Sequence, residues 1–102
     1  MTEVFLHAAE PEGKRYELLL FVSGATPRSL RAVAAVRKLC DQVLSGLYTL
    51  DVIDAFRDPV AARHHRIVAL PTLLRLEPTP RLLLVGDMSD PRPLAAGLGL
   101  DR

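Results

Sequence analysis

The sequence of 102 residues has one cysteine, no tryptophan and almost no net charge. A single Cys40 excludes an internal disulfide and fits a reducing cytoplasm, which is the location we expect. The 13 basic residues against 12 acidic ones leave no global field that would attract nucleic acid or a membrane surface. The composition therefore favours a small folded domain whose partners are recognised locally.

Long apolar runs are also missing. No stretch approaches the roughly 20 apolar residues of a membrane helix. Residues 1–13 have neither the basic start nor the apolar run of a signal peptide, and Pro11 and Gly13 interrupt them. We therefore expect residues 1–14 to be a loose arm and residues 15–102 to be one domain.

The hydrophobic periodicity, together with helix-capping and turn residues, predicts seven elements in the order β-α-β-α-β-β-α. This order corresponds to an α/β fold with a mixed sheet. Thr26-Pro27, Asp58-Pro59 and Ser89 or Asp90 with Pro91 each read as a helix cap followed by a first-turn proline. The expected strands cover residues 16–22, 48–54, 72–76 and 82–85, and the expected helices run from Pro27 to Gly46, 58–65 and 91–98.

The first predicted helix has two faces. Its apolar positions at helical spacing are Leu30, Val33, Val36, Cys40, Val43 and Leu44. The opposite stripe comprises Arg28, Arg31, Lys38 and Gln42, spaced three or four apart. Such a stripe is usually only a solvated face, and a docking surface is the alternative.

Catalytic groups are scarce, and we expect no enzyme activity, metal or cofactor. Cys40 lies on the apolar face, far from the helix start where a reactive thiol would be activated. His64 and His65 point in different directions on a helix and read as a surface pair. Asp51, Asp54 and Asp58 straddle a strand end and a helix cap, and no phosphate-binding glycine loop occurs.

The segment Val68 to Leu73 resembles the proline loop of thioredoxin-type domains, which implies a cis bond between Leu70 and Pro71. Together with four other blocks, it resembles the KaiB family of circadian-clock proteins. The blocks cover residues 20–29, 47–54, 58–59, 67–73 and 85–90. The sensory domain of the clock-associated kinase SasA is a weaker match.

The KaiB resemblance implies a metamorphic adaptor. In that family a tetrameric ground state exchanges with a monomeric thioredoxin-like state that binds the ATPase hexamer KaiC, captures KaiA and competes with SasA. We expect the contact with such a partner to use Arg31 on the first helix, with Arg66 and Arg75 flanking the Pro71 loop, and Gly24 and Thr26 to shape the nearby loop. The switch or structural positions implied are Pro71, Pro78, Pro80, Gly86 and Asp87.

Departures from the family affect the expected state. Residues 91–100 contain two prolines, two alanines and two glycines, which are poor in the strand that the ground state requires there. Leu82 and Leu83 stand where KaiB proteins commonly carry basic residues, and Thr79 interrupts the family's proline-rich turn. We therefore expect the thioredoxin-like fold, the alternative being the ground state with its rebuilt C-terminal half. Two other functions remain open: a module acting with a SasA-type kinase, and a degenerate oxidoreductase using Cys40.

Overall fold

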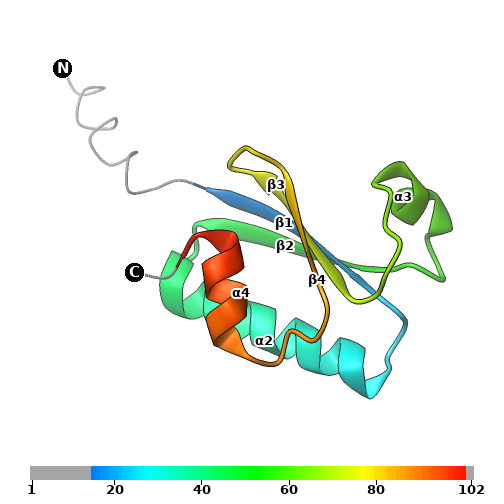
Figure 1. Ribbon diagram of the computed structural model, residues 1–102, viewed down its shortest axis with the longest axis horizontal. Helices are drawn as coiled ribbons and strands as arrows, with labels where there is room; N and C mark the ends of the chain where they lie inside the picture. The colour runs from blue at the N-terminus through cyan, green and yellow to red at the C-terminus, as the bar shows by residue number, and fades with distance from the viewer. Residues whose placement is uncertain (1–14, 101–102) are drawn as a thin grey trace.

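The computed structural model describes residues 15–100, so the predicted arm at 1–14 lies outside the described residues (Figure 1). The seven elements follow the predicted order. They are β1 (Tyr16–Val22), α2 (Pro27–Leu44), β2 (Tyr48–Asp54), α3 (Pro59–His64), β3 (Thr72–Glu77), β4 (Leu82–Val85) and α4 (Pro91–Leu98). Residues 82–85 are a strand and residues 91–98 a helix, as the local sequence predicts.

The four strands form one mixed sheet in the order β2-β1-β3-β4. β1 pairs in parallel with β2, from Tyr16 opposite Tyr48 to Val22 opposite Asp54. β3 is antiparallel to both β1 and β4, with Leu20 opposite Leu73. β1 is therefore central, which explains its nearly continuous apolar sequence.

Each helix begins at a capping side chain followed by proline. Thr26 accepts a hydrogen bond from the Ser29 N–H, Asp58 from Ala61 and Asp90 from Arg92. α2 ends at Ser45, which adopts a left-handed φ of 48°, and Gly46 follows at 83°. The sequence thus predicts the helix starts correctly, and Gly46 lies two residues beyond Leu44, the last residue of α2.

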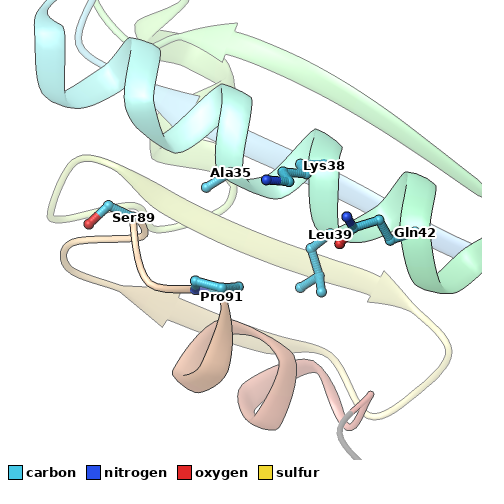
Figure 2. Close-up of a pocket in the computed structure, with 6 residues that line it drawn as sticks. All are labelled: Ala35, Lys38, Leu39, Gln42, Ser89 and Pro91. Atoms are coloured by element: carbon cyan, nitrogen blue, oxygen red, sulfur yellow. The ribbon is translucent and has the colours of Figure 1, made fainter.

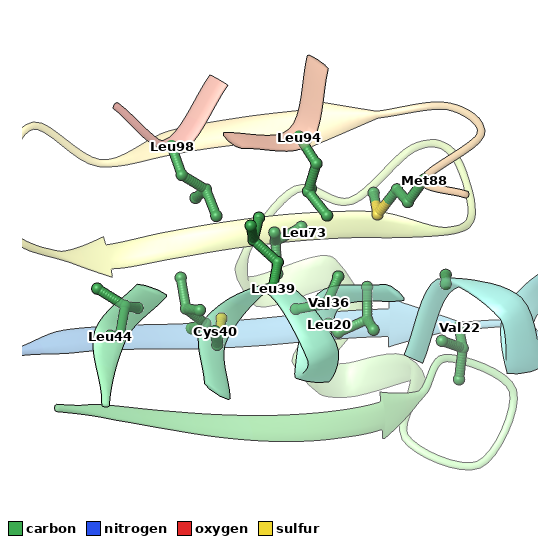
Figure 3. Packing of buried hydrophobic residues seen from close by; sticks show 12 residues of the cluster. Leu20, Val22, Val36, Leu39, Cys40, Leu44, Leu73, Met88, Leu94 and Leu98 are labelled. Atoms are coloured by element: carbon green, nitrogen blue, oxygen red, sulfur yellow. The ribbon is translucent and has the colours of Figure 1, made fainter. Parts of the chain in front are cut away.

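The buried face of α2 differs from the prediction. Ala32, Val36, Leu39, Cys40 and Leu44 face the sheet, whereas Leu30 and Val43 are 57% and 45% exposed. Figure 3 shows Val36 and Leu39 pointing between α4 and the sheet, towards Leu94 and Leu98 of α4 and Leu20 and Leu73 of the strands. Leu30 and Val43 are therefore not core residues, and Ser29 and Ala32 are buried on the face of α2 that also carries Val36, Cys40 and Leu44.

The sheet is covered unequally. α2 and α4 lie on one face, while α3 stands away from them (Figure 1) and buries none of its residues. On the second face, the ring of Phe21 packs against His65, with ring centroids 5.8 Å apart. Leu83 and Val85 of β4 share this second face with Leu74 and Thr72, and they remain 41% and 60% exposed.

α4 approaches β4 closely at Gly97. A Cβ atom at this position would lie 2.6 Å from Cδ2 of Leu84 and 3.0 Å from Cδ1. Glycine is a weak helix former, so the sequence alone makes this helix look poor. The contact supplies the reason for glycine here, because it lets α4 rest on the side chain of Leu84.

Candidate partner-binding surface

The loop between β1 and α2 is held by three hydroxyl groups. The buried Ser29 Oγ accepts a hydrogen bond from the Ser23 N–H at 3.0 Å and one from the Thr26 hydroxyl at 2.9 Å. Gly24 has a φ of 65°, a conformation that glycine adopts without strain. Gly24 and Thr26 therefore shape the loop, and no thiol stands at the start of α2.

Cys40 lies more than three turns along α2, with its side chain buried. Burial, with a smaller contribution from Asp41, raises the pKa of the Cys40 thiol to about 11. The thiolate is the reactive form, so this thiol is suited to packing and poorly suited to exchange chemistry. The geometry opposes the oxidoreductase interpretation.

Pro71 is buried beside this loop. The Leu70–Pro71 bond is cis, as the resemblance implied, and Thr72 is paired with Phe21 at the end of β1. The Thr72 hydroxyl donates to the carbonyl of Ala69 and fixes the approach to β3. The proline loop, the β1–α2 loop and the start of α2 thus meet at one end of the sheet.

The loop after β4 reaches the same end. Gly86 has a φ of 117°, and Asp87 Oδ1 accepts a hydrogen bond from the Ser89 N–H at 3.0 Å. The hydrogen bonds from Ser89 lower the pKa of Asp87, and the nearby charges of Arg28 and Arg31 lower it further. Asp87 therefore lies within electrostatic range of the first turns of α2.

Arg31 is exposed on α2, and within residues 15–100 it takes part in no ion pair. Lys38 and Gln42 continue the same stripe towards the middle of the helix. There they line a cleft of about 250 Å³ with Ala35, Leu39, Ser89 and Pro91 (Figure 2). This cleft could not be seen in the sequence, because its two walls are about 50 residues apart.

Arg66 is exposed, but it is not beside Arg31. It follows α3 in a left-handed conformation with a φ of 59°, directly after His65. His65 packs on Phe21, whereas the neighbouring Leu20 and Val22 belong to the core under α2. Since successive side chains of a strand point to opposite faces, Arg31 and Arg66 flank opposite faces of the sheet.

The placement of Arg75 is wrong. We expected it on the surface beside Pro71, but it lies in β3 with only 8% of its surface exposed. Its guanidinium donates to the carbonyl of Leu98 at 3.2 Å and to that of Pro80 at 2.8 Å. Arg75 is committed to joining α4 and the β3–β4 turn, and it is not available to a partner in this conformation.

The turn that Arg75 holds contains Pro78 and Pro80. Both the Glu77–Pro78 and the Thr79–Pro80 bonds are cis. The turn connects β3 to β4 at the opposite end of the sheet from Pro71. The predicted switch residues are thus divided between the two ends of the sheet, with Pro71, Gly86 and Asp87 at the candidate surface.

The remaining titratable groups in the described part of the chain are dispersed. Within residues 15–100, no three His, Cys, Asp or Glu side chains converge on one point. His64 and His65 stack edge to face with centroids 4.7 Å apart, and burial lowers the pKa of His65. Asp54 and Asp58 accept backbone hydrogen bonds from Phe56 and Ala61. No helix in the described part of the chain is long and apolar enough to cross a membrane.

The comparison with known families agrees with this geometry. A family model described as the KaiB domain matches residues 19–100. The chain belongs to the KaiB family. The circadian clock oscillator protein KaiB of Trichodesmium erythraeum is 39% identical to this KaiB-family chain over 90 residues, covering 88% of it and 86% of the relative. KaiB1 of Synechocystis gives the same values.

Solved structures confirm the thioredoxin-like fold of this KaiB-family chain. The N-terminal domain of Synechococcus elongatus SasA matches with a TM-score of 0.68 and 27% identity, covering 87% of this chain and 88% of that domain. The Drosophila melanogaster thioredoxin Deadhead matches with a TM-score of 0.67 and 16% identity, covering 97% and 92% of the two chains. At that identity the thioredoxin likeness shows the fold alone.

Proposed function

We propose that this chain is a non-catalytic clock or regulatory adaptor that binds a KaiC-type ATPase hexamer in the cytoplasm. Membership of the KaiB family supports the class of function. The single observation that carries the proposed contact is the exposed Arg31, beside the loop that Gly24 and Thr26 shape.

Charge on α2 suits an acidic patch on the partner. Arg28, Arg31 and Lys38 are exposed on the same stripe of the helix. Exposed charges of this kind steer association and contribute more to the on-rate than to the affinity. Arg66 lies on the other side of the sheet and is a secondary candidate for the contact. A partner that binds both Arg31 and Arg66 would need to extend around the end of the sheet.

Size-exclusion chromatography with a KaiC-type ATPase tests the contact. We expect co-migration under at least one nucleotide condition, and loss of the shift in Arg31→Glu. Arg15→Glu is the matched control, because Arg15 is also exposed but precedes β1 at the opposite end of the sheet. No shift of the unmodified chain at roughly 50 µM, a concentration that reveals even weak transient complexes, would sink the proposal.

We also propose that the resting state is the fold described above, with exchange to the KaiB ground state as the possible switch. Three features support a helix at residues 91–98: the Asp90 cap, the close contact of Gly97 with Leu84, and the hydrogen bond from Arg75 to Leu98. Switching requires two packings that differ by only a few kcal/mol. Backbone chemical shifts of residues 58–100 give opposite helix and strand patterns in the two folds. Extended shifts at 91–98 or helical shifts at 82–85 would assign the resting state to the ground-state fold.

A second candidate function is an interaction module that works with a SasA-type kinase, or with KaiA. The likeness to the SasA N-terminal domain favours it specifically. The two functions differ in the partner that is bound directly. Binding to an isolated SasA-type kinase in the absence of any KaiC-type ATPase would favour the second function over the first.

A further inference from the structure

The outer edge of β4 is an unprotected strand edge. Within residues 15–100, β4 pairs only with β3, so its other edge meets no strand. Its sequence, Leu82 to Val85, is entirely apolar and contains no charge, proline or bulge. These are the devices by which natural proteins prevent edge strands from pairing with another chain. β2, at the opposite edge of the sheet, carries exposed Thr49 and Asp51.

α4 rests on the side chain of Leu84, but within residues 15–100 it makes no backbone hydrogen bond to β4. A hollow of about 200 Å³ lies at the end of β4, lined by Leu84, Val85, Asp87, Met88, Pro93 and Leu94. On the second face, Leu83 and Val85 stay 41% and 60% exposed. The edge therefore offers free backbone groups together with two apolar side chains on one side.

We propose that β4 pairs with β4 of a second copy of this chain, antiparallel, to form one continuous eight-stranded sheet. The opposite charges that flank the strand favour a second copy as the occupant. Arg81 precedes β4, and Asp87 follows it by two residues. Antiparallel pairing brings each Arg81 towards the partner copy's Asp87, whereas parallel pairing would place like charges together.

Backbone geometry restricts the register. In an edge strand, every second residue points its backbone N–H and C=O groups away from the sheet. In an antiparallel pair, a residue that points these groups outward lies opposite a partner residue that also points them outward. Pairs of opposed residues must therefore have numbers that add to an even total. Centring the pair on Leu84 satisfies this rule, places Leu83 opposite Val85 in both halves, and brings positions 81 and 87 together.

The same register keeps the apolar side chains together. An antiparallel edge pair is related by a two-fold axis perpendicular to the sheet, so the second faces of both copies lie on the same side. Leu83 and Val85 of the two copies then pack as cross-strand neighbours. Asp87 is exposed; within residues 15–100 its carboxylate accepts hydrogen bonding from Ser89, and the charges of Arg28 and Arg31 are nearby.

The short length of β4 limits the affinity of the dimer. Stable dimers bury about 1,200–2,000 Å² or more, and four paired residues bury less than this range. We therefore expect a reversible dimer with a Kd on the order of 100 µM, monomeric in dilute solution. The proposal does not rest on the function proposed above, since it is argued from the edge of β4 and not from Arg31; Asp87 is the residue common to both surfaces.

Sedimentation velocity of the full chain, from about 5 to about 500 µM, covers the expected transition. We expect Val85→Lys to raise the Kd at least about tenfold, because a charge on the edge opposes pairing. Thr49→Lys is the matched control, adding the same charge to an exposed site on the other edge strand, and should leave the Kd unchanged. Circular dichroism confirms folding, and Leu83→Lys repeats the test should Val85→Lys not fold.

A charge exchange tests the orientation. Arg81→Glu and Asp87→Arg should each weaken the dimer, and the double variant should restore it, with the wild-type dimer weakening as salt is added. A chain that stays monomeric at all concentrations overturns the proposal, as does a dimer that survives Val85→Lys. Failure of the double variant to restore the dimer overturns the antiparallel register.

Discussion

Replacing Arg75 by methionine tests the most unexpected contact in the fold. The guanidinium donates to Leu98 at the C-terminal end of α4 and to Pro80 in the β3–β4 turn, while its buried Nε has no hydrogen-bond partner. Arg75→Met keeps an unbranched chain in the same space but removes both hydrogen bonds. The affected carbonyls belong to α4 and to the β3–β4 turn, which these hydrogen bonds tie to β3.

The expected loss follows from these contacts. Hydrogen bonds that involve a charged group contribute about 1.5–3 kcal/mol each, and the loss of two is offset by removing the buried charge and the unpaired Nε. Tyr16 also donates to Leu98, at 3.4 Å, so that carbonyl keeps one partner. We expect a net loss of about 2 kcal/mol in the free energy of unfolding.

Urea unfolding followed by circular dichroism measures this loss. With a slope of about 1–3 kcal/mol per molar for a small domain, the midpoint should fall by roughly 1–2 M. Arg75→Lys should destabilise at least as much, because it keeps the buried charge and cannot reach both carbonyls. Arg81→Met, which loses one exposed hydrogen bond to His65, is the control. A midpoint for Arg75→Met equal to that of the wild type would refute the reasoning.

Three further predictions concern single positions. Gly97→Ala should change the free energy of unfolding by less than about 1 kcal/mol, since the methyl groups of half-buried Leu84 can shift and alanine gains helix propensity; a loss above about 2 kcal/mol in urea unfolding contradicts this. Burial, then the charges of His64 and Arg81, lowers the pKa of His65, so its contribution to stability is present above about pH 6.5 and is lost as the pH falls below it. His65→Gln should flatten the stability profile between about pH 7 and 5 more than His64→Gln does, and equal slopes would exclude this cause. Native Cys40 should react with a thiol reagent at least about 100 times more slowly than in denaturant, since its pKa rises from 9.0 to about 11; fast native labelling would restore the oxidoreductase hypothesis.

The features that could be predicted from the sequence are those with local causes. Thr26, Asp58 and Asp90 cap their helices through side chains that act within three residues, so each start is encoded beside it. The apolar run of β1 reports burial on both faces of a sheet, which again needs no knowledge of its partners.

The features that could not be predicted depend on distant partners. Arg75 looks like a surface cation, because its two carbonyl acceptors lie in a turn and in a helix that only the folded chain brings together. Leu30 looks like a core residue, because the small side chains that define the true face of α2 carry little hydrophobic signal. The cleft beside Lys38 could not be predicted for the same reason, because its second wall is the start of α4, which is distant in sequence from α2.

The first and second halves of the chain meet in the sheet where β1 pairs with β3. Residues 16–54 form a strand-helix-strand unit in which β1 and β2 pair along their whole length, from Tyr16 opposite Tyr48 to Val22 opposite Asp54. The second half of the chain joins this unit's sheet through five residue pairs between β1 and β3, from Glu17 opposite Glu77 to Phe21 opposite Thr72. Consequently, the β1–β3 ladder is the one backbone connection between the sheet halves among residues 15–100, and opening it would leave the β1–β2 ladder intact.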